Sequence, residues 1–436
     1  MPAVDPQPRR PEYDVNDVSV GIVHLGLGRF HRAHQAVYVD DVLLRDPTWG
    51  IVGVAPHNAT VTSALRRRGN RYTVAFTPPS PEVREIGAIR EAVVAAEDPA
   101  TVIARIADPA VRLCTLTVTE KGYSADLVAR RLDATQTLRA DANAELPATV
   151  LGLLVHGLAL RRPTDAPLTV MSCDNITDNG SLLRDLVTGY AQLRDDGAWS
   201  GLLKWVHARV AFASTVVDRM VPAVDDELAL VAEPFGRWYI SGAGVLPAWP
   251  SADVRVVPDV APYARLKLRV VNGTHTLLAH LGLLAGHSTL CDAAEDAELR
   301  AMAERFLHDD VVPTLDPALP AAEVSAYVDG VLDRAASRVL AYPLAQIATD
   351  SAQKLTQRLV PTALDCLRQG RRPTWVALGV AAWMLSTPAD SDAVDPDELV
   401  RERLADRAVF PPELAENESF RDDVVRWVRE LASAAG

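Results

Sequence analysis

The chain has 436 residues, of which 48% are hydrophobic, and its formal net charge is −13 at pH 7. A chain of this length can form two domains, each with its own hydrophobic core. The acidic surplus argues against binding to nucleic acid or to an anionic membrane, and no run of about 18 apolar residues predicts a membrane span.

The cysteines and the N-terminus bear on metal binding and on the compartment. The four cysteines stand far apart and include no Cys-x-x-Cys pair (Cys114, Cys173, Cys291 and Cys366). This spacing disfavours a structural zinc, a disulfide framework and the zinc-dependent alcohol dehydrogenases. Residues 1–16 are rich in proline and charge and lack the apolar segment of a secretory signal. We therefore expect a flexible arm over residues 1–17, no metal, and a cytoplasmic protein.

The first predicted strand covers residues 18–25 and is followed by Gly26-Leu27-Gly28 and a segment of helical spacing over residues 33–44. A strand, a Gly-x-Gly turn and a helix form the arrangement in which backbone amides hold a pyrophosphate. His31 stands where the third glycine of the usual fingerprint would be, and two glycines alone more often mark a tight turn. His31 and His34 have no further ligand cluster nearby, so we interpret them as turn and capping residues.

A second strand is predicted over residues 51–55, and the residues after it bear on the cofactor. In a dinucleotide site an acidic residue near this point binds the adenosine ribose of NAD. Here Pro56, His57 and Asn58 follow the strand, with no acid among them. Asn58 is able to bond a ribose hydroxyl. The run Arg66 to Arg68 fits a solvated helix face better than a site for a 2′-phosphate, so we expect NAD, with NADP possible.

Three further predicted strands end in polar residues. Residues 113–119 lead into Glu120-Lys121-Gly122-Tyr123, residues 168–173 into Asp174 and Asn175, and residues 210–217 into Asp218 and Arg219. Ligands of open parallel sheets bind beyond the carboxyl ends of the strands, which places these residues near a ligand. Each also fits a structural role. Glu120 and Asp218 suit ion pairs with their neighbours, and Asp174 and Asn175 suit a turn or a helix cap.

Prolines 247, 250, 258 and 262 cluster where we expect the chain to cross into a second domain. The segments that follow have helical spacing, without strand alternation or an internal repeat. The predicted fold is therefore an α/β, Rossmann-like, doubly wound domain over residues 18–255, followed by an all-α domain over residues 256–436.

Near the start of the second domain, an apolar-periodic helix carries an unusual polar run, Asn272-Gly-Thr-His275, shortly after Lys267. A buried polar group without a partner costs ~1–3 kcal/mol, so such a run usually faces a ligand or a satisfied polar network. At ~100° per residue, Lys267, Asn272 and His275 share an arc of about 140° on an ideal α-helix. They are nevertheless ~12 Å apart along its axis from first to last.

Lysine is rare in this chain: it occurs only at positions 121, 204, 267 and 354, although Lys and Arg together number 44. Arginine stays protonated at any working pH, whereas a buried lysine can lose its proton and act as a base. Lysine at position 267 therefore suits general base catalysis. Lys354 and Arg358, at i and i+4, are able to bind a carboxylate or sugar hydroxyls, although solvated charges are usual for such a pair.

The stretch Lys-Leu-Arg-x-x-Asn-Gly-x-His resembles the signature of the polyol-specific long-chain dehydrogenases, the mannitol dehydrogenase family. That family includes mannitol 2-dehydrogenase, arabinitol dehydrogenase, fructuronate reductase (mannonate oxidoreductase) and tagaturonate reductase. Other family-like stretches follow in order from about residue 18 to residue 360, and one of them, Val-Asp-Arg-Met-Val-Pro, departs from the pattern at Met220. The stretch over residues 345–358 resembles the members that act on hexuronates.

The resemblance implies roles for particular residues. Gly26, Gly28, Arg29 and Phe30 would belong to the dinucleotide loop. Glu120 would lie on a proton path from the catalytic lysine to solvent and would also contribute to cofactor binding. The substrate would be held by residues from several segments (Asn175, Asp218, Lys354 and Arg358).

A metal-independent hydride transfer between a nicotinamide and a secondary alcohol follows from these roles. Lys267 would be the base, Asn175 and Asn272 would bond the developing alkoxide, and His275 would orient the substrate oxygen. The substrate would be a polyol or a sugar acid of the mannitol or mannonate type, and the protein a monomer or small homo-oligomer. A pentitol dehydrogenase and a non-catalytic NADH-binding regulator are the alternatives.

Overall fold

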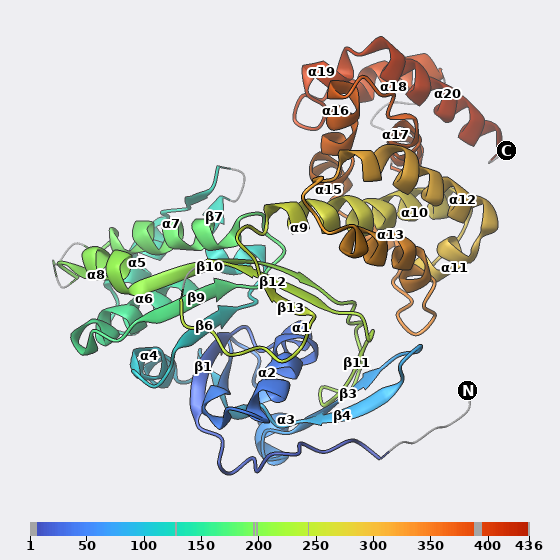
Figure 1. Cartoon of the computed structure of the whole chain (residues 1–436). Coiled ribbons are helices and arrows are strands. Elements are labelled where there is room, and N and C mark those ends of the chain that lie inside the picture. The colour runs from blue at the N-terminus through green and yellow to red at the C-terminus, as the bar shows by residue number, and fades with distance from the viewer. Residues whose placement is uncertain are drawn as a thin grey trace. The chain divides into compact units, whose positions relative to one another are not determined.

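The computed structural model describes residues 7–126, 129–194, 197, 199–242, 244–387 and 395–434 (Figure 1). The chain divides into two compact units, Met1–Ala261 and Pro262–Gly436. The first unit is built on a largely parallel sheet and the second on helices. The predicted fold class is therefore confirmed, whereas the exact boundary between residues 255 and 256 stays a prediction.

Within its described residues, the first unit contains an eight-stranded sheet in the order β13-β12-β10-β9-β6-β1-β2-β5. All neighbouring strands are parallel except β10 and β12, which are antiparallel. The chain runs from β1 toward one edge and then returns to add β6 on the other side of β1, so the strand order reverses between β1 and β6. The strands are β1 (Val20–Leu25), β2 (Gly50–Ala55), β5 (Ile89–Val94), β6 (Leu113–Leu116), β9 (Leu168–Ser172), β10 (Val210–Asp218), β12 (Arg237–Ser241) and β13 (Val254–Val256).

Both faces of this sheet are covered, which explains the nearly continuous apolar runs of its strands. Ile22 and Ile51 point into one core, with α2 and α3, whereas Val23 and Val52 point into another, with α4, α6 and α7. Figure 1 shows helices on the two sides of the sheet. The helices are α1 (Arg29–Ala33), α2 (Gln35–Leu43), α3 (Ala59–Arg67), α4 (Pro99–Ala107), α5 (Gln136–Asn143), α6 (Val150–Arg161), α7 (Asn179–Ala191) and α8 (Leu202–Arg209), with 3₁₀ turns η1 (Pro47–Trp49), η2 (Glu120–Tyr123) and η3 (Arg162–Thr164).

Two small sheets complete the described part of the first unit. One orders β11 (Ala229–Ala232), β3 (Tyr72–Phe76) and β4 (Glu82–Ile86), and the other pairs β7 (Ala125–Asp126) with β8 (Arg131–Leu132).

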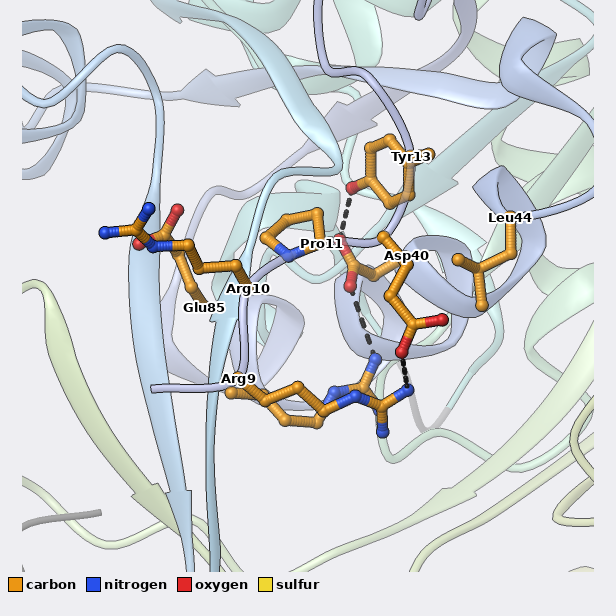
Figure 2. Close-up of a pocket in the computed structure, with 9 residues that line it drawn as sticks. Arg9, Arg10, Pro11, Tyr13, Asp40, Leu44 and Glu85 are labelled. Carbon is orange, nitrogen blue, oxygen red and sulfur yellow. Dashed lines mark hydrogen bonds and ion pairs between the residues drawn. The ribbon is translucent and has the colours of Figure 1, made fainter. Parts of the chain in front are cut away.

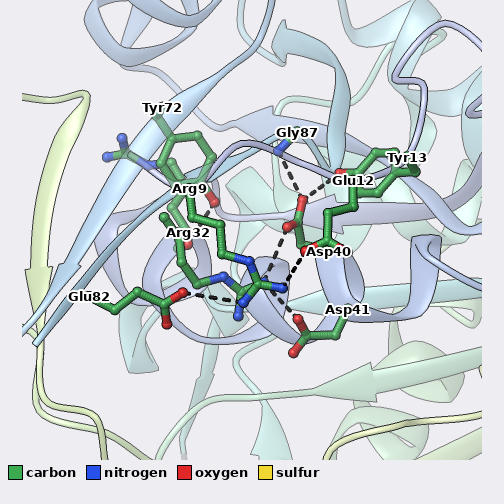
Figure 3. Close-up of polar contacts among 10 residues, drawn as sticks. Arg9, Glu12, Tyr13, Arg32, Asp40, Asp41, Tyr72, Glu82 and Gly87 are labelled. Carbon is green, nitrogen blue, oxygen red and sulfur yellow. Dashed lines mark hydrogen bonds and ion pairs between the residues drawn. The ribbon is translucent and has the colours of Figure 1, made fainter. Parts of the chain in front are cut away.

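The described part of the N-terminal arm, residues 7–17, runs along β4 and packs on α2. Arg9 donates its backbone N–H to the Val83 carbonyl at 2.8 Å, so it extends the small sheet. Figure 2 shows the small charged pocket that the arm forms with Asp40, Leu44 and Glu85. The Tyr13 hydroxyl donates to the buried Asp40 carboxylate, which also accepts the Gly87 N–H at 3.0 Å (Figure 3). The composition of residues 1–17 did not predict these contacts, and residues 1–6 lie outside the described part.

The second unit contains only helices and turns in its described residues, apart from one isolated bridge between Thr289 and Pro343. Helices α10 and α17 are buried over most of their length, which makes them central in this unit. No helix in the described part is long and apolar enough to cross a membrane. The elements are α9 (Ala261–Leu266), the π-helix η4 (Lys267–Asn272), α10 (Gly273–Leu284), α11 (Leu290–Glu295), α12 (Ala297–Arg305), the π-helix η5 (Phe306–Val311), η6 (Val312–Thr314), α13 (Ala321–Ala335), α14 (Leu344–Ile347), α15 (Ser351–Arg358), α16 (Val360–Arg368), α17 (Thr374–Ser386), α18 (Pro396–Leu404), α19 (Pro412–Ala415) and α20 (Glu418–Ala434).

Candidate functional site

Predicted site residues lie at the carboxyl ends of four adjacent strands of the large sheet. Gly26 follows β1, Glu120 lies just beyond β6, Asn175 follows β9, and Asp218 ends β10. Because β1, β6, β9 and β10 are neighbours and parallel, their carboxyl ends lie side by side. The reversal of strand order between β1 and β6 is the place where open α/β sheets bind their ligands.

The turn after β1 requires its first glycine. Gly26 has a φ of +104°, and a Cβ atom there would lie 2.0 Å from the Thr117 carbonyl oxygen at the end of β6. Gly26 and Leu27 donate their N–H groups to the Val54 carbonyl at 2.8 and 3.0 Å, which ties the turn to β2 as well. Gly28 caps α1, and both Gly28 and Arg29 are exposed, so the outer side of the turn is open to a ligand.

Phe30, which was also assigned to this loop, packs on His34. Their rings stack at 5.0 Å between centroids, and the His34 Nε2 lies 3.0 Å from the Arg237 carbonyl oxygen. His34 stands at the junction of α1 and α2. The described residues hold no group of three or more His, Cys, Asp or Glu side chains arranged for a metal ion.

The residues after β2 form a helix cap. The side-chain oxygen of Asn58 accepts the Thr60 N–H at 2.8 Å and so caps α3. Both His57 and Asn58 are exposed. Arg66, Arg67 and Arg68 are exposed at the opposite end of α3. Arg66 stands eight positions after Asn58, about 12 Å along the helix axis, and its Nε donates to the Ala92 carbonyl at 2.8 Å, so this run fits an exposed helix face better than a phosphate site.

Asp174 organises the loop that begins at the end of β6. Its carboxylate accepts the N–H groups of Val118 and Thr119, both at 3.0 Å, and the Tyr123 hydroxyl at 2.7 Å. Thr119 has a φ of +62°, a left-handed conformation that costs a residue with a branched side chain free energy. Asp174 therefore holds the strained backbone just before Glu120, whose side chain lies outside the described part. Burial raises the pKa of Asp174 above its usual value.

The neighbouring loop that carries Asn175 is fixed to β10. The Asn179 side chain donates to the carbonyls of Asp174 and Thr215, both at 3.1 Å, and accepts the Thr215 N–H at 2.8 Å. Asn175 itself is exposed at this edge. Asp174 thus shapes the turn, which is the structural role that the sequence also suggested for it. Asn175 lies at the surface of the candidate site.

Asp218 is 4% exposed and ends β10. Its neighbour Arg219 donates to the carbonyls of Ala33 and Phe235, at 2.8 and 3.1 Å, and so joins the end of β10 to the junction of α1 and α2.

In the second unit, Lys267 opens a π-helical turn rather than an α-helical one. The segment Lys267–Asn272 forms η4, which α9 precedes and α10 follows. Our estimate of about 140° and ~12 Å assumed α-helical geometry throughout and is wrong for this segment. The hydrogen bonds of a π-helix join residues i and i+5, so Asn272 lies one turn above Lys267 on the same side. Lys267 is 8% exposed, and His275 follows in the first turn of α10.

A partly buried ion pair anchors this π turn. Arg269 is 4% exposed; it meets the Asp365 carboxylate at 2.5 Å and donates to the Thr314 carbonyl at 2.9 Å. These partners come from α16 and from the end of η6, so distant segments fix the turn. Sequence reasoning missed Arg269, although it is the arginine of the Lys-Leu-Arg stretch.

Lys354 and Arg358 on α15 are only partly exposed, rather than solvated. The Lys354 ammonium donates to the Ile347 carbonyl at 2.9 Å, and burial lowers the pKa of Lys354, helped by the charge of Arg358. Arg358 donates through Nη1 to the Thr276 hydroxyl at 2.9 Å, next to His275 on α10. Burial lowers the pKa of Arg358 to about 10, and its buried Nε–H has no acceptor among the described residues.

The family model described as the mannitol dehydrogenase Rossmann domain matches residues 20–251, and the model described as the mannitol dehydrogenase C-terminal domain matches residues 259–432. The chain is 35% identical over 404 residues to a polyol:NADP oxidoreductase of Gluconobacter oxydans (strain 621H), covering 86% of this chain and 81% of the relative.

It is 36% identical over 423 residues to the D-mannonate oxidoreductase of Escherichia coli (strain K12), covering 91% of this chain and 86% of the relative. Among solved structures it resembles Pseudomonas fluorescens mannitol 2-dehydrogenase in a ternary complex with NAD and D-mannitol. The TM-score is 0.82 and the identity 29%, over 99% of this chain and 95% of that one.

Proposed function

Because the chain belongs to the mannitol dehydrogenase family and is an NAD(P)-dependent oxidoreductase, we propose that it interconverts a secondary alcohol of a linear polyol or sugar acid with the ketone. Lys267 acts as the general base of this reaction. The observation that carries the proposal is the buried Lys267 at the start of a π turn, with Asn272 one turn above it.

In the direction of oxidation, the substrate hydroxyl gives its proton to the Lys267 amine. The amine must be neutral to accept this proton, a form that lysine can reach at working pH and arginine cannot. A bound nicotinamide would supply the hydride acceptor for the carbinol carbon. Asn272 and Asn175 donate amide N–H groups to the oxygen as negative charge develops there.

His275 orients the substrate oxygen, and Glu120 passes the proton from Lys267 toward solvent. Asp218 bonds the substrate hydroxyls. No metal takes part, because the amine and the amides supply proton transfer and charge stabilisation. Cytoplasmic location and a monomeric or small homo-oligomeric state stay predictions.

For the substrate we propose a sugar acid of the mannonate and fructuronate type. Arg358 supports this class, because its guanidinium reaches α10 beside His275 and keeps a buried N–H without an acceptor among the described residues. A carboxylate is a strong acceptor for such a donor, and a buried unmatched donor costs free energy that a carboxylate would recover. The D-mannonate oxidoreductase relative acts on a substrate of this kind by its name.

For the cofactor we propose NAD, with NADP also accepted. The turn after β1, Arg29 and Phe30 would hold the dinucleotide, and Asn58 would bond a ribose hydroxyl. Pro56 to Asn58 place no carboxylate after β2, so nothing there repels a 2′-phosphate. The relatives' names include both an NADP enzyme and an NAD complex, which is consistent with either cofactor.

The experiment that tests the proposed function follows absorbance at 340 nm with NADH or NADPH. The substrates are fructuronate, tagaturonate, fructose and xylulose, each at several concentrations. We expect the highest kcat/KM with fructuronate. A clear preference for xylulose would favour a pentitol dehydrogenase instead, and no oxidation of either cofactor with any substrate would contradict the proposed reaction.

A further inference from the structure

A histidine occupies the place of the third fingerprint glycine. In the usual fingerprint that glycine lets the helix pack closely on the strand. Here His31 of α1 is 1% exposed, and its ring lies flat against the ring of His24 from β1. The ring centroids are 3.3 Å apart and the planes differ by 10°. The helix therefore meets the strand through two stacked imidazoles instead of through a bare backbone.

The edge of the His24 ring holds the glycine turn. His24 Nε2 lies 2.9 Å from the Gly26 carbonyl oxygen, and the Thr117 hydroxyl donates to that same oxygen at 2.8 Å. On the other edge, Nδ1 lies 2.7 Å from the Thr115 hydroxyl. Thr115 lies in β6 and Thr117 directly follows it. The His24 ring therefore connects β1 to the end of β6, next to the glycine turn.

Both rings are neutral at ordinary pH. Burial lowers the pKa of His24 to about 3 and also lowers the pKa of His31. A neutral imidazole has one N–H donor and one acceptor. With Nε2–H donating to the Gly26 carbonyl, and the Thr117 hydroxyl oxygen also 2.9 Å from Nε2, Nδ1 accepts the Thr115 hydroxyl proton.

We infer that His24 and His31 are positioning residues for dinucleotide binding: His31 fixes the plane of His24, and His24 holds the Gly26 carbonyl and so sets the turn. This inference rests on the proposed function, in which the pyrophosphate lies over that turn. Both rings are buried, so they act on a bound dinucleotide through the turn and not by direct contact. Their loss therefore weakens nucleotide binding, while turnover of the saturated enzyme changes little.

The test is a double-mutant cycle on the full chain with His31→Ala, His24→Leu and the double variant. The dissociation constant of NADH is measured by fluorescence titration, and kcat is measured at saturating NADH. His156→Ala is the control. His156 is a buried histidine of the same unit, but its ring packs on Trp199 and not on the glycine turn. Thermal unfolding of each variant is recorded beside these values.

We expect each single variant to raise the NADH dissociation constant by roughly tenfold, the upper end of the worth of one neutral hydrogen bond. The double variant should bind like His24→Leu alone, because His31 acts through His24. His31→Phe, which keeps a flat ring, should bind NADH within about threefold of the wild type. His156→Ala should lower the unfolding temperature without changing NADH binding.

Unchanged NADH binding in folded His31→Ala, or strictly additive effects in the double variant, would overturn the inference. So would an equal loss of affinity in His156→Ala, because that would show a general loss of stability. Failure of the wild type itself to bind NADH would instead contradict the proposed function, so the two failures are distinguishable.

Discussion

The contacts of Asp174 allow the effect of a single-atom substitution to be worked out. Its Oδ2 accepts the Val118 N–H and the Tyr123 hydroxyl, and its Oδ1 accepts the Thr119 N–H. In Asp174→Asn, the amide oxygen can replace only one carboxylate oxygen. The amide NH₂ group then faces a donor, in the best case the Thr119 N–H.

Loss of that hydrogen bond costs ~1–3 kcal/mol. The removal of a buried charge offsets part of this cost, since burial raises the pKa of Asp174. A net loss of ~1–2 kcal/mol lowers the unfolding temperature of a unit of this size by roughly 2–8 °C. The left-handed Thr119 is then no longer held, so the segment before Glu120 shifts. A shift of about 1 Å can lower turnover by up to 10²-fold.

The assay combines thermal unfolding with kcat at saturating NADH and substrate. Asp98→Asn is the matched control, because Asp98 caps α4 by accepting the Thr101 N–H and asparagine caps equally well. We expect a lower unfolding temperature and lower kcat in Asp174→Asn alone. A kcat within about twofold of the wild type, in a variant that unfolds at lower temperature, would refute the role of Asp174 in holding this loop.

Three other predictions concern pH, substrate and metal. Burial raises the pKa of Asp310 to about 6, so its contribution to stability is present below about pH 4 and is lost as pH rises through 6. Asp310→Asn keeps an oxygen that accepts the Trp375 and Val376 N–H groups but carries no charge. In urea unfolding, this variant should be more stable than the wild type at pH 7.5 but not at pH 4. Lower stability of the variant at pH 7.5 would contradict this prediction. Arg358→Ala should lower kcat/KM for fructuronate by about 10²-fold and for fructose much less, and equal losses would remove Arg358 from carboxylate binding. Dialysis against EDTA should leave steady-state turnover unchanged, whereas a loss that zinc restores would overturn the metal-free mechanism.

Features set by local sequence patterns could be predicted. The alternation of apolar runs and glycine turns predicted a doubly wound sheet, and both faces of that sheet are indeed covered. Polar residues directly after strands, such as Asn175 and Asp218, could be assigned to one edge, because parallel neighbours end on the same side. The helical character of the second unit followed from spacing alone.

Features set by distant contacts could not be predicted. The π turn at Lys267 is held by Arg269, whose partner Asp365 stands 96 residues later in the chain. Helical spacing read at 100° per residue contains no sign of such a turn. The stacking of His24 on His31 likewise depends on the packing of α1 against β1. The contact of the N-terminal arm with α2 depends on the hydrogen bond from the Tyr13 hydroxyl to Asp40, 27 residues later in the chain.

The central claim is that Lys267 is the base, and Lys267→Arg tests it most directly. Arginine keeps the positive charge and much of the bulk but has no neutral form at working pH. The measurement compares kcat with the NADH dissociation constant in the same preparation. Lys204→Arg, at an exposed position on α8, serves as the control. The account predicts that kcat falls by ~10²–10⁴ in Lys267→Arg while NADH affinity stays intact. Near wild-type turnover in a folded Lys267→Arg variant would contradict it.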